Sequence, residues 1–164
     1  EVGQEYLQNV LDTAKQLDAY DSGRIYYYLG EYQKAYLALD EARDKGGADS
    51  YLYLGRAYAA TGDYNYASSV YNNYLSKQGP NAEIYNELGL CEMAKKEYQN
   101  ALAAFQAGKQ IEGNSLMQTL CFNEIVAYEY LEDYQQAEVL MNAYLQNYPD
   151  DQTAIREQQF LSTR

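Results

Sequence analysis

A five-residue pattern, made of an acidic residue, Tyr, two variable residues and Ala, occurs four times along the chain. The copies are Glu31–Ala35, Asp63–Ala67, Glu97–Ala101 and Asp133–Ala137. Their alanines are 32, 34 and 36 residues apart. Self-similarity at a period of roughly 20–50 residues is typical of proteins built by stacking one supersecondary unit. The pattern therefore predicts four copies of one such unit.

Each copy lies between two helical patterns. Tyr and Ala three residues apart lie on one face of a helix, and the small Ala lets a partner helix come close. Four residues after each Ala, the apolar stripe continues with Leu39, Tyr71, Phe105 and Met141. The preceding helices are expected to end near Tyr28, Ala60, Ala94 and Tyr130. The following helices are expected over 36–44, 68–77, 102–111 and 138–147. Each unit is thus predicted to be a helical hairpin.

The turn inside each hairpin has its own signal. Gly30 and Gly62 stand just before the acid, where a glycine in the left-handed conformation ends the first helix. Lys96 and Glu132 take that place in the last two units. A non-glycine in this conformation costs about 1 kcal/mol, so we expect those two turns to differ slightly. The acid then begins the second helix, where the helix dipole favours negative charge.

Breaks and ends complete the pattern. The second helices are expected to close at Gly46-Gly47, Gly79-Pro80, Gly113-Asn114 and Pro149-Asp150. Residues 152–163 are predicted to form a capping helix with Ile155, Phe160 and Leu161 facing inward. At the front, a helical stripe is formed by Tyr6, Leu7, Val10, Leu11, Ala14 and Leu17. It is either a cap or the second helix of an earlier repeat. A long helix continuing toward Gly23 is an alternative, because no Gly or Pro intervenes.

The chain resembles the tetratricopeptide repeat family, whose units carry a large aromatic, Leu-Gly and Tyr, followed by Ala, an aromatic and Pro. The second unit matches best, with Tyr51, Leu54, Gly55, Tyr58, Gly62, Tyr64, Ala67 and Tyr71. The third has Tyr85, Leu88, Gly89, Tyr98, Ala101 and Phe105, with Glu92 at the usual Tyr. The first has Gly23, Tyr26, Gly30, Tyr32, Ala35 and Ala42, with Ala19 at the leading aromatic. The fourth keeps Tyr128, Tyr134, Ala137 and Pro149, but Glu124 and Ile125 replace Leu-Gly. That replacement predicts an altered contact with the third unit.

The resemblance implies an all-α fold, a right-handed superhelical solenoid of four TPR helical hairpins with an N-terminal helix and a C-terminal capping helix. The whole chain is expected to be one domain. Its parts are the N-terminal helix 1–15, repeats 16–47, 48–81, 82–117 and 118–151, and the capping helix 152–164.

Composition excludes several classes of function. A net charge of −12 disfavours nucleic acid, and no apolar run approaches the roughly 20 residues that span a bilayer, so no direct membrane insertion is expected. The absence of His removes Ser-His-Asp triads and His-ligated metals. We therefore expect no enzymatic activity, no cofactor and no metal. Cys91 and Cys121 are read as buried thiols, with a disulfide between neighbouring hairpins as the alternative.

In this family the first helix of each hairpin lines a concave groove. Mapped by matching the repeats, the candidate groove residues are Tyr20, Arg24, Tyr27, Tyr28, Tyr53, Arg56, Asn86, Phe122, Asn123 and Tyr130. Arg24 and Arg56 follow the matched glycines, so they are expected to project side by side and to meet a carboxylate or a backbone carbonyl. The alternative is that they pair with acids such as Asp21 or Asp49 while the tyrosines merely coat the scaffold.

These features predict a non-enzymatic module that binds a protein or peptide. The chaperone-tail clamp of some family members is not reproduced, because Glu83 and Glu87 stand where basic groups are needed. A self-associating assembly protein and a cell-envelope protein that takes a saccharide on its tyrosines are the alternatives. An extracytoplasmic bacterial lipoprotein fragment and a cytoplasmic adaptor both fit the composition.

Overall fold

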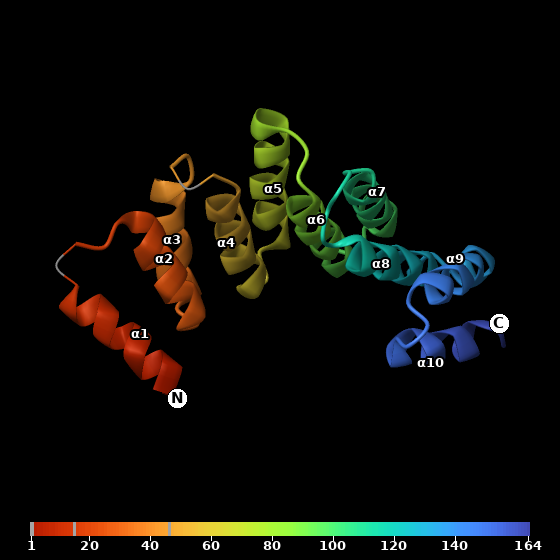
Figure 1. Ribbon diagram of the computed structural model, residues 1–164. Coiled ribbons are helices and arrows are strands. Elements are labelled where there is room, and N and C mark those ends of the chain that lie inside the picture. The colour runs from red at the N-terminus through yellow and green to blue at the C-terminus, as the bar shows by residue number, and fades with distance from the viewer. Residues whose placement is uncertain (1, 15, 46) are drawn as a thin grey trace. The chain divides into compact units, whose positions relative to one another are not determined.

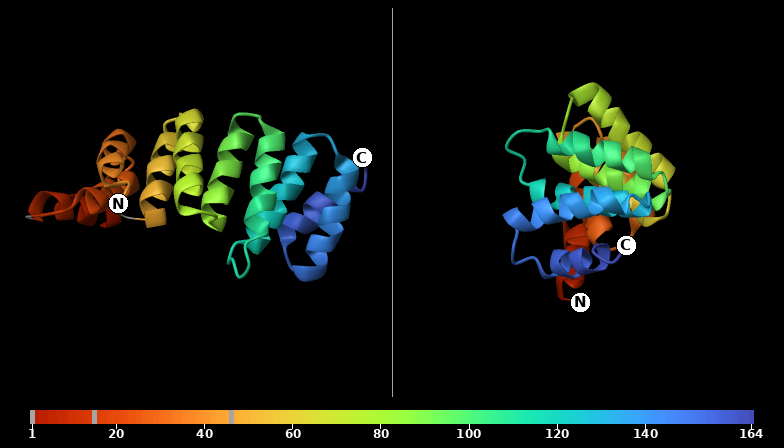
Figure 2. Two further views of the ribbon diagram at one scale, coloured as in Figure 1. Left: turned by 90° about the horizontal axis from the view of Figure 1, so that it is seen from above. Right: turned by 90° about the vertical axis from the view of Figure 1, so that its right-hand side faces the viewer.

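The computed structural model describes residues 2–14, 16–45 and 47–164, which form ten α-helices and no strand (Figures 1 and 2). The chain divides into two compact units, Glu1–Gly79 and Pro80–Arg164. The first unit contains α1 (Val2–Thr13), α2 (Ala19–Tyr28), α3 (Tyr32–Ala42), α4 (Gly47–Ala60) and α5 (Tyr64–Gln78). The second contains α6 (Ala82–Ala94), α7 (Tyr98–Lys109), α8 (Met117–Tyr130), α9 (Tyr134–Asn147) and α10 (Gln152–Leu161). The all-α helical-repeat fold is confirmed.

The four hairpin turns share one backbone geometry. The first helices α2, α4, α6 and α8 end at the four predicted residues. In each turn the N–H of the acid donates to a carbonyl five residues back, as Asp63 does to Tyr58 (3.0 Å) and Asp133 does to Tyr128 (3.0 Å). This bond is the signature of a helix closed by a left-handed residue. The second helices begin directly after the acid, at Tyr32, Tyr64, Tyr98 and Tyr134.

The last two turns differ only slightly from the first two. Lys96 (φ 65°) and Glu132 (φ 60°) adopt the left-handed conformation of Gly30 (φ 78°) and Gly62 (φ 85°). The closing hydrogen bonds are the same, because the packing of the two helices requires this turn whatever residue occupies it. The two non-glycines therefore carry backbone strain that the hairpins offset elsewhere.

Asp and Glu differ at the start of the second helix. The side chain of Asp63 accepts from the N–H of Tyr66 (3.1 Å), and Asp133 accepts from Gln136 (3.2 Å). Glu31 and Glu97 make no such capping bond. The longer Glu side chain does not fold back onto its own helix, so only the aspartates act as hydrogen-bonding caps.

The core of each hairpin depends on a close approach between a glycine and a large side chain. A Cβ added at Gly55 would lie 2.3 Å from Cζ of Tyr71, and one added at Gly89 would lie 2.3 Å from Cε1 of Phe105. Gly23 packs in the same way on Leu39. The small residue on the first helix thus makes room for the ring or branched side chain of the second.

The fourth hairpin solves this packing problem differently. Ile125 stands in place of the glycine and Met141 in place of the ring, and both are buried in one cluster. The unbranched Met side chain yields the space that the Ile side chain needs. The contact with the third unit is present, since buried Glu124 accepts hydrogen bonds from Gln106 (2.9 Å) and Lys109. Glu124 therefore preserves this contact through polar partners, while Ile125 packs in the apolar cluster of the fourth hairpin.

The N-terminal stripe does not continue into the first hairpin. Helix α1 ends at Thr13, and α2 begins at Ala19, where Asp18 accepts from the N–H of Asp21 (2.8 Å). The long continuous helix is therefore wrong, because a capped helix start lies in its path. No residue of α1 is buried, and Tyr6 is exposed.

The structure also corrects the end of the first hairpin and the inward face of the capping helix. Helix α3 ends at Ala42, before the predicted Gly46-Gly47 break; Gly47 begins α4, and Gly46 lies outside the described residues. In α10 Leu161 is buried as predicted, but Phe160 is 38% exposed. Phe160 and Leu161 are adjacent, and neighbouring residues of a helix diverge by about 100°, so both cannot face the same core.

We predict that Gly55→Ala destabilises the protein by about 2–3 kcal/mol, because the added methyl group would overlap the fully buried ring of Tyr71. Urea denaturation followed by circular dichroism measures the change. The double variant Gly55→Ala/Tyr71→Leu is expected to recover part of the loss. A Gly55→Ala protein as stable as the wild type would contradict the close approach.

We predict that Lys96→Gly stabilises the protein by up to about 1 kcal/mol, because glycine adopts the left-handed conformation without a steric penalty. The matched control Gly62→Ala puts a side chain into the equivalent turn, where no atom within 4 Å would contact it, and should be destabilising. Thermal unfolding of both variants gives the comparison. A destabilised Lys96→Gly would show that backbone strain is not the dominant effect there.

Candidate functional site

Six of the predicted groove residues form one cluster in the first unit. Tyr20, Arg24, Tyr27 and Tyr28 lie on α2, and Tyr53 and Arg56 lie on α4. We call these six residues the Arg24 surface. The Arg24 guanidinium carbon lies 5.2 Å from the ring centroid of Tyr20 and 5.3 Å from that of Tyr53. The corresponding distance from Arg56 to the Tyr53 ring is 6.0 Å. Both arginines therefore lie within cation–π range of one tyrosine.

The tyrosines of this surface hold one another. The hydroxyls of Tyr28 and Tyr53 are 2.6 Å apart, and the ring of Tyr27 makes edge contacts with both. Burial, with the hydrogen bond between the Tyr53 and Tyr28 hydroxyls as a second cause, raises the pKa of Tyr53. Tyr53 therefore stays protonated at physiological pH, and the charge of the Arg24 surface comes from its two arginines.

The alternative expectation, that the arginines pair with acids such as Asp21 or Asp49, does not hold for Arg24. The carboxylate of Asp49 accepts a hydrogen bond from the Tyr20 hydroxyl instead (3.4 Å). Among the described residues, Arg24 packs against tyrosine rings, and its buried Nε has no hydrogen-bond partner. A buried donor without a partner costs about 1–3 kcal/mol, which the surrounding contacts must offset.

The four predicted residues of the second unit do not form one cluster. Asn123 Nδ2 donates to Asn86 Oδ1 (2.9 Å), which joins α8 to α6. Phe122 makes an edge contact with Tyr144 (5.7 Å between centroids), and Tyr130 stacks on Tyr98 (5.0 Å). Matching the repeats placed Asn86 on the first helix of the third hairpin and the other three residues on that of the fourth, but their side chains contact different partners.

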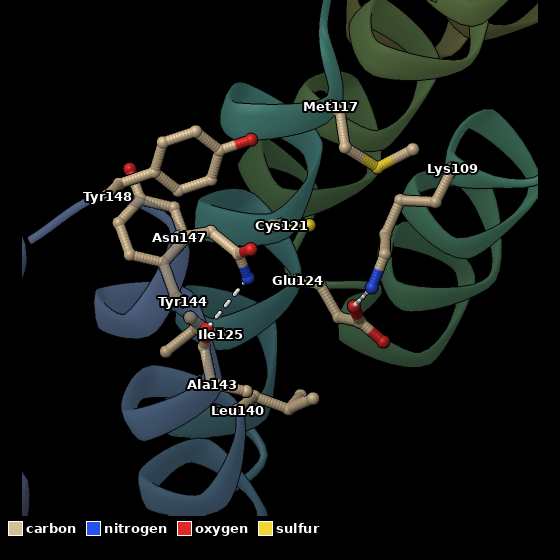
Figure 3. A pocket seen from close by; sticks show the side chains of 10 residues that line it. All are labelled: Lys109, Met117, Cys121, Glu124, Ile125, Leu140, Ala143, Tyr144, Asn147 and Tyr148. Carbon is tan, nitrogen blue, oxygen red and sulfur yellow. Dashed lines mark hydrogen bonds and ion pairs between the residues drawn. The ribbon is translucent and has the colours of Figure 1, made fainter. Parts of the chain in front are cut away.

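The structure contains a pocket between α7, α8 and α9 that the sequence did not predict. Its volume is about 320 Å³ (Figure 3). Its lining is Lys109, Met117, Cys121, Glu124, Ile125, Leu140, Ala143, Tyr144, Asn147 and Tyr148. Figure 3 shows the Lys109 amine directed at the Glu124 carboxylate, with which it forms an ion pair. The lysine charge is therefore neutralised within the chain. The sequence signal was Glu124 at the place of a core Leu, since a buried acid requires a partner.

Both cysteines are free thiols, so the disulfide alternative is wrong. Burial raises the pKa of Cys91 to about 12. Cys121 is only half-buried, and burial raises its pKa too, although Lys109 opposes the shift. The pKa shifts keep both thiols protonated and poorly nucleophilic at neutral pH.

Two carboxyl groups face each other in the second unit. Burial, and then the negative charge of Glu157 on α10, raise the pKa of Glu129 on α8 to about 7. Glu129 Oε1 is buried and has no hydrogen-bond partner while both groups are ionised, because neither carboxylate can then donate. Glu129 is therefore the acid whose charge the fold accommodates poorly.

No described residues form a group of three or more His, Cys, Asp or Glu side chains that could hold a metal ion. None of the helices in the described ranges is both long and apolar enough to cross a membrane.

The sequence matches two profiles described as tetratricopeptide repeat. One matches residues 20–65 and 54–114, and the other matches residues 122–151. Together they span most of the chain. No curated protein sequence matches.

Solved structures with the same fold are similar to this chain at low identity. A crystal structure of the MamA protein is 19% identical, with a TM-score of 0.75 over 87% of this chain and 78% of that one. MamA from AMB-1 is 22% identical, with a TM-score of 0.70 over 98% and 81%. The second TPR domain of human RPAP3, in complex with an HSP70 peptide, is 17% identical, with a TM-score of 0.64 over 72% and 97%. At these identities the likeness establishes the fold.

We predict that the protein loses stability between pH 5 and pH 8 through Glu129. Because its folded-state pKa is raised from 4.5 to about 7, the protonated form favours folding. The stabilising contribution of protonated Glu129 to the free energy of unfolding is complete below pH 4.5 and is lost as the pH rises through 7. Solvent screening at this half-buried group reduces the effect to about 1–2 kcal/mol.

Urea unfolding of Glu129→Gln at pH 5 and pH 8 tests this prediction. Between pH 5 and pH 8, the variant should lose about 1–2 kcal/mol less of its free energy of unfolding than the wild type does. Glu112→Gln, at an exposed acid of the same unit, makes the same charge change and should leave the pH dependence intact. An equal effect of both variants would attribute the pH dependence to net charge.

Proposed function

The chain belongs to the tetratricopeptide repeat family, and we propose that it is a non-enzymatic module that binds a peptide or protein segment on the Arg24 surface. Helical-repeat proteins use the extended surfaces of their stacked hairpins for binding. The Arg24 surface lies on α2 and α4, the first helices of two consecutive hairpins.

The observation that carries the proposal is the packing of Arg24 between two tyrosine rings (5.2 and 5.3 Å). Tyr and Arg are enriched among the residues that contribute most to protein interfaces. The rings restrict the guanidinium before any ligand arrives, so less side-chain entropy is lost on binding.

The chemistry of this surface suits a carboxylate-bearing segment. A guanidinium bonds a carboxylate through parallel N–H donors, and two arginines lie here in a chain of net charge −12. The RPAP3 domain of the same fold is in complex with the peptide SGPTIEEVD, which contains acidic residues. That complex supports the ligand class.

We predict that a phage-displayed random peptide library selected on the full chain enriches sequences with Asp, Glu or a free C-terminal carboxylate. The double variant Arg24→Ala/Arg56→Ala should bind the enriched peptides at least tenfold more weakly in isothermal titration calorimetry. This loss corresponds to about 1.4 kcal/mol, the contribution expected of charge-assisted hydrogen bonds.

Arg24→Lys is the matched control, because it keeps the charge but loses the planar stacking on Tyr20 and Tyr53. It should bind with intermediate affinity. Thermal unfolding must show that all variants remain folded. Unchanged affinity in the double variant would exclude the Arg24 surface as the binding site.

A further inference from the structure

A further cavity in the second unit is lined by aromatic and acidic side chains. It has a volume of about 360 Å³ and is lined by Glu129, Tyr130, Glu132, Tyr134 and Phe160. We call it the Glu129 pocket. Its lining residues belong to the end of α8, the following turn, the start of α9 and the end of α10. Three aromatic rings and two carboxyl groups therefore line one cavity.

A cation already lies on the wall of this pocket. The Arg164 guanidinium carbon is 4.4 Å from the ring centroid of Phe160 and 5.7 Å from that of Tyr134. Both distances are within the range of a cation–π interaction. The chain's own arginine thus shows that a guanidinium fits against these two rings.

The buried Glu129 carboxyl of the pocket has another acid, rather than a cation, beside it. Glu129 Oε1 is buried without a hydrogen-bond partner and faces the Glu157 carboxyl. Glu132, in the left-handed turn, adds a third acid to the surroundings. A cation entering the pocket would relieve the repulsion between these groups.

The lining selects an organic cation over a metal ion. The three rings supply π faces, whereas Mg²⁺ and Ca²⁺ require six or more oxygen ligands, including water. Within the described ranges no three acidic, His or Cys side chains are arranged to hold a metal. A planar guanidinium can stack on a ring and donate to carboxylates at its edge, which a compact ammonium group does less well.

We propose that the Glu129 pocket binds an arginine side chain of a partner protein. Phe160 and Tyr134 stack on the guanidinium, and Glu129 and Glu132 accept its hydrogen bonds. Arg164 is the internal competitor for the same rings. The proposal is independent of the Arg24 surface, which lies in the other unit and takes ligands of opposite charge.

The test is an NMR titration of the full chain with the peptide acetyl-Gly-Arg-Gly-amide at pH 8. We expect saturable binding, and at least fivefold weaker binding of the same peptide with citrulline, the neutral isostere of arginine. Glu129→Gln and Phe160→Ala should each weaken binding about three- to tenfold, as expected for a lost ion pair or cation–π contact. Arg164→Gln should tighten binding at least twofold, because it vacates the rings.

The controls separate the pocket from general attraction to an acidic protein. Glu112→Gln makes the same charge change as Glu129→Gln at an exposed position and should leave the affinity unchanged. Equal binding of the citrulline peptide, or an equal loss in Glu112→Gln, would overturn the proposal. Weaker or unchanged binding in Arg164→Gln would do so too, as would tighter binding of a lysine or trimethyllysine peptide. Phe160 is partly exposed, so its truncation should leave the fold intact.

Discussion

The close approach of the two helices in each hairpin is the constraint on which the rest of the structure depends. A glycine or a compensating pair of side chains must face the large residue of the partner helix, as Gly55 faces Tyr71 and Ile125 faces Met141. Once that contact is made, the turn between the helices has one permitted geometry. It imposes the left-handed conformation even on Lys96 and Glu132. The surfaces described above rest on helices whose spacing is set in this way.

Tyrosine gives this scaffold its particular chemistry. A buried tyrosine ring packs like a phenylalanine ring, but its hydroxyl needs a partner. Tyr51 donates to Asp44 (3.0 Å) and Tyr144 donates to Asp151 (2.7 Å), so each ties its helix to a neighbouring acid. Where tyrosines reach the surface of α2 and α4, the same rings support arginines instead. One residue type thus serves both the core and the candidate binding surface.

The two proposed surfaces have opposite chemistry. The Arg24 surface presents guanidinium groups on tyrosine rings, whereas the Glu129 pocket presents carboxyl groups beside tyrosine and phenylalanine rings. Under these proposals, the first surface would attract acidic segments despite the net charge of −12, and the second would attract cations with the help of that charge. A module with both can distinguish partners by the sign of their charge as well as by their shape.

The repeat alone determined the number of hairpins, the ends of their first helices and the grouping of Arg24 with Arg56, because side chains that recur at one period recur at one place in a stacked unit. Tertiary packing decided the rest. The N-terminal helix stops at Thr13 because the next helix has its own capped start, and Phe160 stays exposed because its neighbour Leu161 takes the place in the core. Neither outcome can be read from the local sequence pattern. The pocket beside Lys109 and Glu124 and the facing of Glu129 with Glu157 join different helices. Such contacts depend on side-chain directions that no spacing along the sequence specifies.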